Sequence, residues 1–227
     1  MKNRYTVAAV LAITLFLAGT AALAASNEAI KRNNFGAELV KQDRLDEAAK
    51  EFQSAILADP RYAAAHLNLA FTYDRLGRAD EAILAYKKAA ELDPSNGTVL
   101  NNLGVLYIKK EMYDQAISVL EQGVKVDQAN PTLQKNLEIA KKNRDNLTER
   151  EARIANAQKQ TAAKPKDPQA AYNLARVYAA FDMPDPALEW LGKALQLGFD
   201  DLRFAREDPA LTGLRTDPRF TRLLESR

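Results

Sequence analysis

The sequence predicts an all-α protein in which short helix pairs stack into a solenoid. Aromatic residues make up only 7% of the 227 residues while alanine is abundant, and this composition favours packed helices over sheets. Small and large apolar residues recur every 34 residues along most of the chain, a period typical of helical repeats. The length suits one domain, or one domain with a small appendage.

The repeat is visible as columns of residues that share a size. Ala48, Ala82 and Ala116 are 34 residues apart, and a column of large residues follows each of them by four positions. The other columns are Phe52, Tyr86 and Leu120; Ala55, Ala89 and Gly123; Phe35, Leu69, Leu103 and Leu137; Gly36, Ala70 and Gly104; and Leu39, Tyr73 and Tyr107. Each unit is therefore expected to be a helix–turn–helix that buries its apolar face only by stacking on its neighbour.

Helix breakers stand where the units should end and turn. Pro60 and Pro94 close one unit and suit the first turn of the next helix. Gly77 lies where the turn between the two helices of a unit favours a left-handed residue. The small residues in the Gly36 column are expected to let the two helices of a unit approach closely.

These columns resemble the tetratricopeptide repeat (TPR): small at position 8, aromatic or Leu at 11, Ala at 20, a large residue at 24, Ala at 27 and Pro at 32. Three units fit within residues 26–130, and a further unit fits within 164–201 through Tyr172, Ala175, Tyr178 and Ala187. The resemblance implies a right-handed superhelical α-solenoid. Gly123 in place of Ala and the late Pro131 depart from the pattern and suggest altered packing there.

Two segments fit the pattern less well. Residues 131–163 carry Glu138 where a small residue is expected and Lys141 where an aromatic is expected, and the rest is highly charged. This segment is either a degenerate fourth unit or one long charged helix. Residues 202–227 contain two Asp-Pro helix starts, at Pro209 and Pro218, and resemble the closing segment of many bacterial TPR chains, which predicts short capping helices.

Residues 1–25 have the order of a secretory signal peptide: two basic residues, an apolar stretch, then small residues around Ala22 and Ala24. We predict cleavage and a periplasmic or secreted bacterial protein. The alternative is an uncleaved leader that anchors the domain to the inner membrane with the domain outside the cytoplasm. The absence of cysteine excludes a lipid-anchored lipoprotein and any disulfide requirement.

Composition argues against several classes of function. Removing Lys2 and Arg4 with the leader leaves equal numbers of basic and acidic residues, so no nucleic-acid partner is expected. His66 is the one histidine and is interpreted as structural. With no cysteine and no phosphate-binding loop, the chain is predicted to be no enzyme and to use no metal or cofactor.

The predicted partner site is the concave groove that first helices of stacked units create, a prediction that follows from the resemblance. An asparagine recurs at position 6 of each unit, and an asparagine amide can both donate and accept hydrogen bonds to an extended peptide. The asparagine row consists of Asn34, Asn68, Asn102 and Asn136. The groove is also expected to have an apolar centre, made of Leu67, Phe71, Val105 and Ile108. Its basic edge is expected to be made of Lys41, Arg75 and Lys109. The alternatives are that asparagine is simply common at this position and that Leu67 and Phe71 pack internally.

TPR domains that clamp a C-terminal carboxylate carry lysine, arginine or asparagine at five positions that correspond to Asn33, Ala37, Asn68, Thr98 and Asn102. Only Asn68 matches, so an internal peptide segment or a helix is the expected ligand. We therefore predict an exported adaptor or scaffold that binds a protein or peptide segment. The alternative is a self-associating or structural envelope-assembly factor that uses the convex face and the charged segment 141–160.

Overall fold

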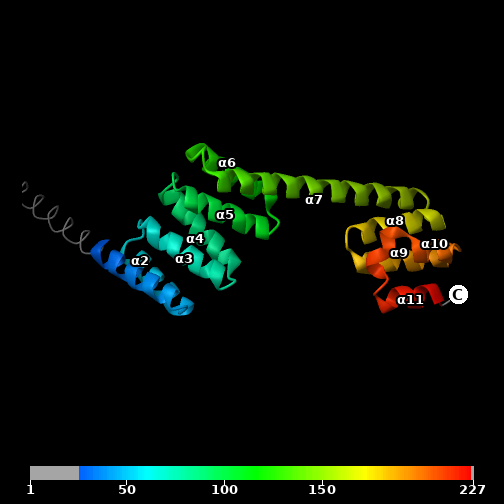
Figure 1. The fold of residues 1–227 in the computed structure, drawn as a ribbon, viewed down its shortest axis with the longest axis horizontal. Helices are drawn as coiled ribbons and strands as arrows, with labels where there is room; N and C mark the ends of the chain where they lie inside the picture. Colours follow the sequence, from blue (N-terminus) through cyan, green and yellow to red (C-terminus); the bar gives the residue numbers. More distant parts are fainter. Residues whose placement is uncertain (1–25, 226–227) are drawn as a thin grey trace, which may run out of the picture. The chain divides into compact units, whose positions relative to one another are not determined.

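The computed structural model describes residues 26–225, and all regular structure in that part of the chain is helical (Figure 1). The predicted all-α solenoid is confirmed. The predicted signal peptide lies outside the described residues. The chain divides into two compact units, Met1–Asn143 and Arg144–Arg227, which are described separately below.

The first unit is a run of antiparallel helix pairs. A helix over residues 26–41 precedes α2 (Leu45–Ala58), and the next pairs are α3 (Ala63–Arg75) with α4 (Ala79–Leu92) and α5 (Gly97–Lys109) with α6 (Tyr113–Val126). Each of α2 to α5 packs against the next one along the chain. Short connections of this kind make sequence neighbours into spatial neighbours, as the 34-residue period requires.

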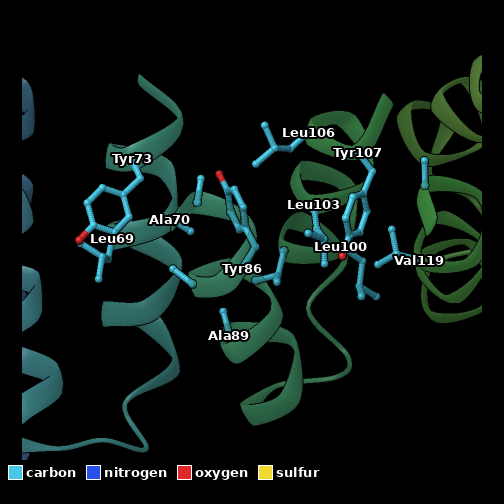
Figure 2. Packing of buried hydrophobic residues seen from close by; sticks show 14 of the residues in the cluster. Leu69, Ala70, Tyr73, Tyr86, Ala89, Leu100, Leu103, Leu106, Tyr107 and Val119 are labelled. Carbon is cyan, nitrogen blue, oxygen red and sulfur yellow. The ribbon is translucent and has the colours of Figure 1, made fainter. Parts of the chain in front are cut away.

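Small residues set the distance between the helices of a pair. A Cβ atom placed on Gly36 would lie 2.7 Å from the ring of Phe52, and one on Gly104 would collide with Leu120. Figure 2 shows the resulting core, in which Tyr86 and Leu103 fill the space between neighbouring helices. Ala48, Ala82 and Ala116 are each 0% exposed. Most residues of the predicted size columns are therefore packing residues, and Phe35, which is 53% exposed, is an exception.

The turns inside the helix pairs use left-handed residues, but glycine supplies only one of those in the first unit. Gly77 has a φ of 74°, whereas Asp43 and Glu111 occupy the same conformation with φ of 60° and 58°. In the second unit Asp182 does the same with a φ of 54°. A non-glycine residue in this region is strained by its Cβ.

Residues 131–163 form one continuous helix, α7 (Pro131–Ala163, 33 residues). The part of this helix up to Asn143 belongs to the first unit, and the part from Arg144 belongs to the second. Leu133 and Ala140 are 0% exposed in the core of the first unit, while Ala157 belongs to the core of the second. Within residues 26–225, none of the helices combines the length and apolar character needed to cross a membrane.

The second unit contains the end of α7, the pair α8 (Pro168–Ala180) and α9 (Pro184–Gln196), and three short elements. These are α10 (Leu202–Glu207), the 3-10 helix η1 (Pro209–Leu214) and α11 (Pro218–Glu225). η1 packs on α8 and α11 packs on α9. Leu211, Phe220 and Leu224 are buried in this contact, so the C-terminal segment covers the last helix pair.

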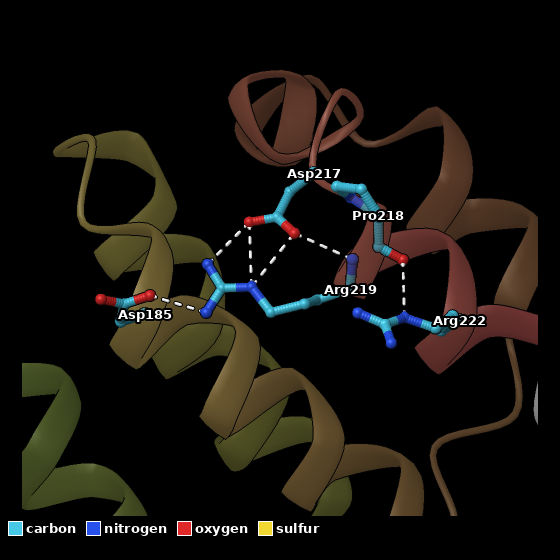
Figure 3. Close-up of polar contacts among 5 residues, drawn as sticks. All are labelled: Asp185, Asp217, Pro218, Arg219 and Arg222. Atoms are coloured by element: carbon cyan, nitrogen blue, oxygen red, sulfur yellow. Dashed lines mark hydrogen bonds and ion pairs between the residues drawn. The ribbon is translucent and has the colours of Figure 1, made fainter.

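Polar groups fix the closing segment to the pair beneath it. The buried Asp208 carboxylate accepts hydrogen bonds from the Tyr172 hydroxyl at 2.8 Å and the Ala210 amide at 2.9 Å. Arg176 Nε lies 2.7 Å from the same carboxylate but is not aligned for a hydrogen bond, so this contact is an ion pair. In Figure 3, Arg219 bridges Asp217 at the start of α11 and Asp185 on α9.

Candidate functional site

The asparagines predicted to line the binding site form inter-repeat contacts. Asn68 Nδ2 donates to Asn33 Oδ1 at 2.8 Å, and Asn136 Nδ2 donates to Asn101 Oδ1 at 2.8 Å. Both bonds connect positions 35 residues apart, so they join first helices of successive units. The sequence did not predict these bonds. They make two separate asparagine pairs, and each bonded amide keeps a second N–H and further acceptor capacity.

Asn102 has a different partner, the hydroxyl of Tyr86. Burial, together with the negative charge of Asp74, raises the pKa of Tyr86 to about 12, and the Asn102 hydrogen bond opposes this rise. The hydroxyl therefore stays protonated at neutral pH. Asn34, at the start of the row, is exposed, whereas Asn68, Asn102 and Asn136 are half-buried.

Apolar side chains lie one helical turn beyond the asparagines. Phe71 follows Asn68 by three positions and is 43% exposed, and Ile139 follows Asn136 by three and is 36% exposed. Residues three apart on a helix share a face, so these side chains border the asparagine row. Leu67 and Ile108 are half-buried against the core, and Val105 is half-buried. The exposed apolar part of the site thus depends on Phe71 and Ile139.

The predicted basic edge is a row of ion pairs. Arg75 lies 2.7 Å from Asp43, Lys109 lies 3.1 Å from Asp74, and Lys41 lies 2.7 Å from Glu38. The first two pairs link one repeat to the next. All three cations are exposed, so they remain accessible to a ligand that can replace or join their carboxylate partners. We call the asparagine row, Phe71, Ile139 and these three cations the first-helix surface.

A cavity elsewhere in the first unit was not predicted. It has a volume of about 410 Å³, and Ile56, His66, Tyr73 and Leu84 are among its lining residues. His66 is 8% exposed and its Nε2 lies 3.0 Å from the carbonyl oxygen of Pro60, as expected for a structural histidine. Leu84, one of the lining residues, is 67% exposed.

The described part of the chain, residues 26–225, brings no three metal-ligating side chains together. Its acidic residues serve mainly as helix caps and ion-pair partners. Asp167, Asp201 and Asp208 each accept a hydrogen bond from a backbone amide in the first turn of the helix that follows. The polar chemistry available for a ligand is therefore that of amides and paired charges.

Comparisons with known proteins agree with this geometry. Two family models, each described as a tetratricopeptide repeat, match residues 33–97 and 75–138. The sequence has no match among curated proteins. These two matches overlap in the middle of the first unit and run from its first helix into α7.

Solved structures with similar folds are TPR domains. The first TPR of Spaghetti (RPAP3), solved bound to an HSP90 peptide, matches with a TM-score of 0.50 and 21% identity over 52% of this chain and 93% of that chain. The first TPR domain of human RPAP3 matches with a TM-score of 0.50 and 20% identity over 53% and 95%. The Sgt2 TPR domain from Aspergillus fumigatus matches with a TM-score of 0.50 and 18% identity over 54% and 82%.

The repeat columns, the stacked helix pairs, the family models and the structural neighbours lead to one assignment. At these identities the structural neighbours establish the fold, while the family models identify the repeat itself. Residues 33–138 of the chain are tetratricopeptide repeats.

Proposed function

We propose that this protein is an exported adaptor that binds a segment of another protein on the first-helix surface. The observation that carries the proposal is the position of Phe71 and Ile139, which are exposed one helical turn from the bonded asparagines Asn68 and Asn136. Exposed apolar side chains rimmed by polar groups are typical of partner sites. Amides that are held in place by one hydrogen bond can offer their remaining groups to a peptide backbone without further ordering.

The TPR fold supports binding as the general activity, and a structural neighbour, the first TPR of Spaghetti (RPAP3), was solved with a peptide. That peptide is from HSP90, but the clamp residues at the equivalent positions are largely missing here. We infer that the ligand is an internal extended segment or a helix. Export depends on the predicted leader at residues 1–25, which would place the partner in the periplasm or outside the cell.

The test uses residues 26–227 as bait for cross-linked capture from an envelope fraction. Phe71→Asp places a charge in the apolar part of the first-helix surface, and Leu84→Asp is the matched control because Leu84 is 67% exposed in the adjacent helix α4. We expect Phe71→Asp to lose the captured proteins and Leu84→Asp to retain them, with equal helix content in both. Equal capture by the Phe71→Asp bait would contradict the proposal.

A further inference from the structure

The helix order α2, α3, α4 of the first unit recurs inside the second unit. One constant shift in residue number, from 63 to 168, carries α3 onto α8, the start of α4 onto the start of α9, and the end of α2 onto the end of α7. A hydrogen bond recurs with it, since Gln53 Nε2 donates to the Tyr73 hydroxyl at 2.6 Å and Gln158 Nε2 donates to the Tyr178 hydroxyl at 2.8 Å. Residues 150–163, α8 and α9 therefore correspond to α2, α3 and α4.

Each of these sets of three helices has an opening at the same place. In the first unit it is the cavity of about 410 Å³ between α2, α3 and α4, which we call the α2–α4 groove. In the second unit an opening of about 210 Å³ is lined by residues of α7, α8 and α9. Four pairs of equivalent residues line the two openings: Gln53 and Gln158, Ile56 and Thr161, Leu69 and Leu174, and Lys88 and Lys193.

A fifth equivalent position carries side chains of very different size. It is Ala85 in the first unit and Trp190 in the second, and both residues line their openings. The Trp190 side chain is half-buried against the core of the second unit, and its ring centroid lies 4.2 Å from Lys193 Nζ. Ala85 contributes only a methyl group, and the α2–α4 groove is about twice as large as its counterpart. The second unit thus places an indole where the first unit has open space.

Neighbouring side chains do not fill the space that Ala85 leaves. Ile56 and His66 are larger than Thr161 and Ala171, the residues at the equivalent positions, yet the α2–α4 groove is the larger opening. Two further lining residues, Leu69 and Tyr73, are 7% and 6% exposed, so the groove has a mostly apolar floor. Such a floor gains free energy when an apolar ring covers it.

We propose that the α2–α4 groove binds the indole of a tryptophan in a segment of a partner protein. The indole would take the place among α2, α3 and α4 that Trp190 has among the equivalent helices of its own unit. The proposal goes beyond the first-helix surface and does not depend on it. That surface uses Asn68 and Phe71 of α3, whereas the groove uses Leu69 and Tyr73, which lie on another face of the same helix.

Lys88 gives the groove an electrostatic preference for an aromatic ring. It occupies the position of Lys193, whose ammonium contacts the Trp190 ring. Lys88 pairs with Glu91 at 2.9 Å, but both side chains are exposed, so the pair is weak and the ammonium can turn to a ring. Among the aromatic side chains, an indole offers a cation the strongest such contact. An aliphatic side chain offers none.

The rim of the groove is compatible with a carboxylate. Leu84 is equivalent to Glu189, which is exposed and directly precedes Trp190 in the second unit. A carboxylate at this position therefore coexists with an indole in the neighbouring opening. For this reason Leu84→Asp, the control for the first-helix surface, is expected to retain binding in the α2–α4 groove as well.

The direct test uses residues 26–227 with a fluorinated N-acetyltryptophanamide as the probe, observed by fluorine NMR so that Trp190 gives no signal. We expect the probe line to shift and broaden with added protein until the site is saturated. Ala85→Trp places an indole in the groove, as in the second unit, and should abolish the effect. Lys87→Trp is the matched control, because it adds the same side chain at an exposed position of α4 that does not line the groove.

A second variant tests the electrostatic contact without altering the floor of the groove. Lys88 is exposed, so Lys88→Gln should keep the helix content measured by circular dichroism. It is expected to raise the dissociation constant of the tryptophan probe about threefold. A fluorinated N-acetylleucinamide should bind more weakly than the tryptophan probe, and Lys88→Gln should leave its binding unchanged. If Ala85→Trp loses helix content, the Lys88→Gln measurement decides the question.

Four results would overturn the proposal. The first two are an unchanged probe line with the unmodified protein and equal binding of the probe by a folded Ala85→Trp variant. The third is equal binding of the leucine and tryptophan probes, which would mean that the groove has no preference for a ring. The fourth is much tighter binding of free tryptophan than of the capped probe, which would make the amino acid itself the ligand in place of a protein segment.

Discussion

The two compact units differ in the kind of side chain that they bury between their helices. In the first unit, the helices meet through apolar columns such as Ala116 and Leu120, both 0% exposed. In the second, a carboxylate is buried with them: Asp208 is 1% exposed and is held by Tyr172, Arg176 and the Ala210 amide. Apolar contacts tolerate small shifts, whereas a buried carboxylate has to meet each partner at hydrogen-bond distance. The polar contact therefore specifies where the closing segment sits.

The largest loss of stability is expected when a side chain is removed from the apolar core of the first unit. Leu120→Ala removes a fully buried side chain opposite Gly104 and should lower the free energy of unfolding by about 3–4 kcal/mol. Helix circular dichroism during urea unfolding measures the change. Leu84→Ala, at an exposed position of α4, is the control and should change stability by less than about 0.5 kcal/mol. A similar loss in both would show that position 120 is not a packing centre.

The polar contact of the second unit should be nearly as sensitive. Asp208→Ala leaves Arg176 and the Tyr172 hydroxyl without their partner and should cost about 3 kcal/mol, since Arg176 is partly exposed. Trp190 is the one tryptophan of the chain and lies on α9, so its fluorescence reports unfolding of this unit. Asp200→Ala, an exposed change nearby, is expected to leave the transition in place.

High pH should lower the free energy of unfolding of the first unit. Burial raises the pKa of Tyr86 from 10.0 to about 12 in the folded protein. The unfolded chain therefore releases this proton first, and the contribution of Tyr86 is intact below pH 10 and is lost as the pH rises toward 12, by about 2 kcal/mol. Unfolding at pH 9 to 12 measures the loss. Tyr86→Phe should flatten the pH profile, and an unchanged profile would contradict the assignment.

The smallest expected difference compares the two equivalent hydrogen bonds. Gln53→Ala and Gln158→Ala each remove one side-chain bond to a tyrosine and should each cost about 1 kcal/mol or less. Urea unfolding followed by helix circular dichroism measures both changes. A cost well above about 1 kcal/mol for only one of the two variants would contradict their equivalence.

Much of the fold follows from residue size in the sequence. The Ala48 and Phe52 columns predicted which side chains are buried, because a repeat that stacks on itself needs small residues where helices cross. The course of α7 could not be predicted in this way. Asp43 and Glu111 make turns without glycine, and Asp145 belongs to the same column yet lies inside a helix. An acidic residue is compatible with a left-handed turn and with a helix, so the residue type at this position does not distinguish the two.

The candidate site was only partly predictable for a similar reason. The 34-residue spacing of the asparagines and the position of Phe71 can be read from the sequence. The Asn68–Asn33 and Asn136–Asn101 bonds depend on which way each amide points once the neighbouring helix is in place. The same holds for the basic edge, where Lys41, Arg75 and Lys109 each pair with a carboxylate on a nearby turn or helix. Residue type determines which hydrogen bonds and ion pairs are possible, and the neighbouring helix determines which of them form.

The left-handed turn residues have a consequence for protein engineering. Asp43, Glu111 and Asp182 hold a backbone conformation that glycine adopts without steric cost. Asp43 also pairs with Arg75 of the next repeat, so its strain is linked to a contact between repeats. Glu111→Gly and Asp182→Gly should therefore raise the melting temperature, whereas Asp43→Gly should gain less. A thermostable form of this solenoid can be sought at its turns while its helices and surfaces are left unchanged.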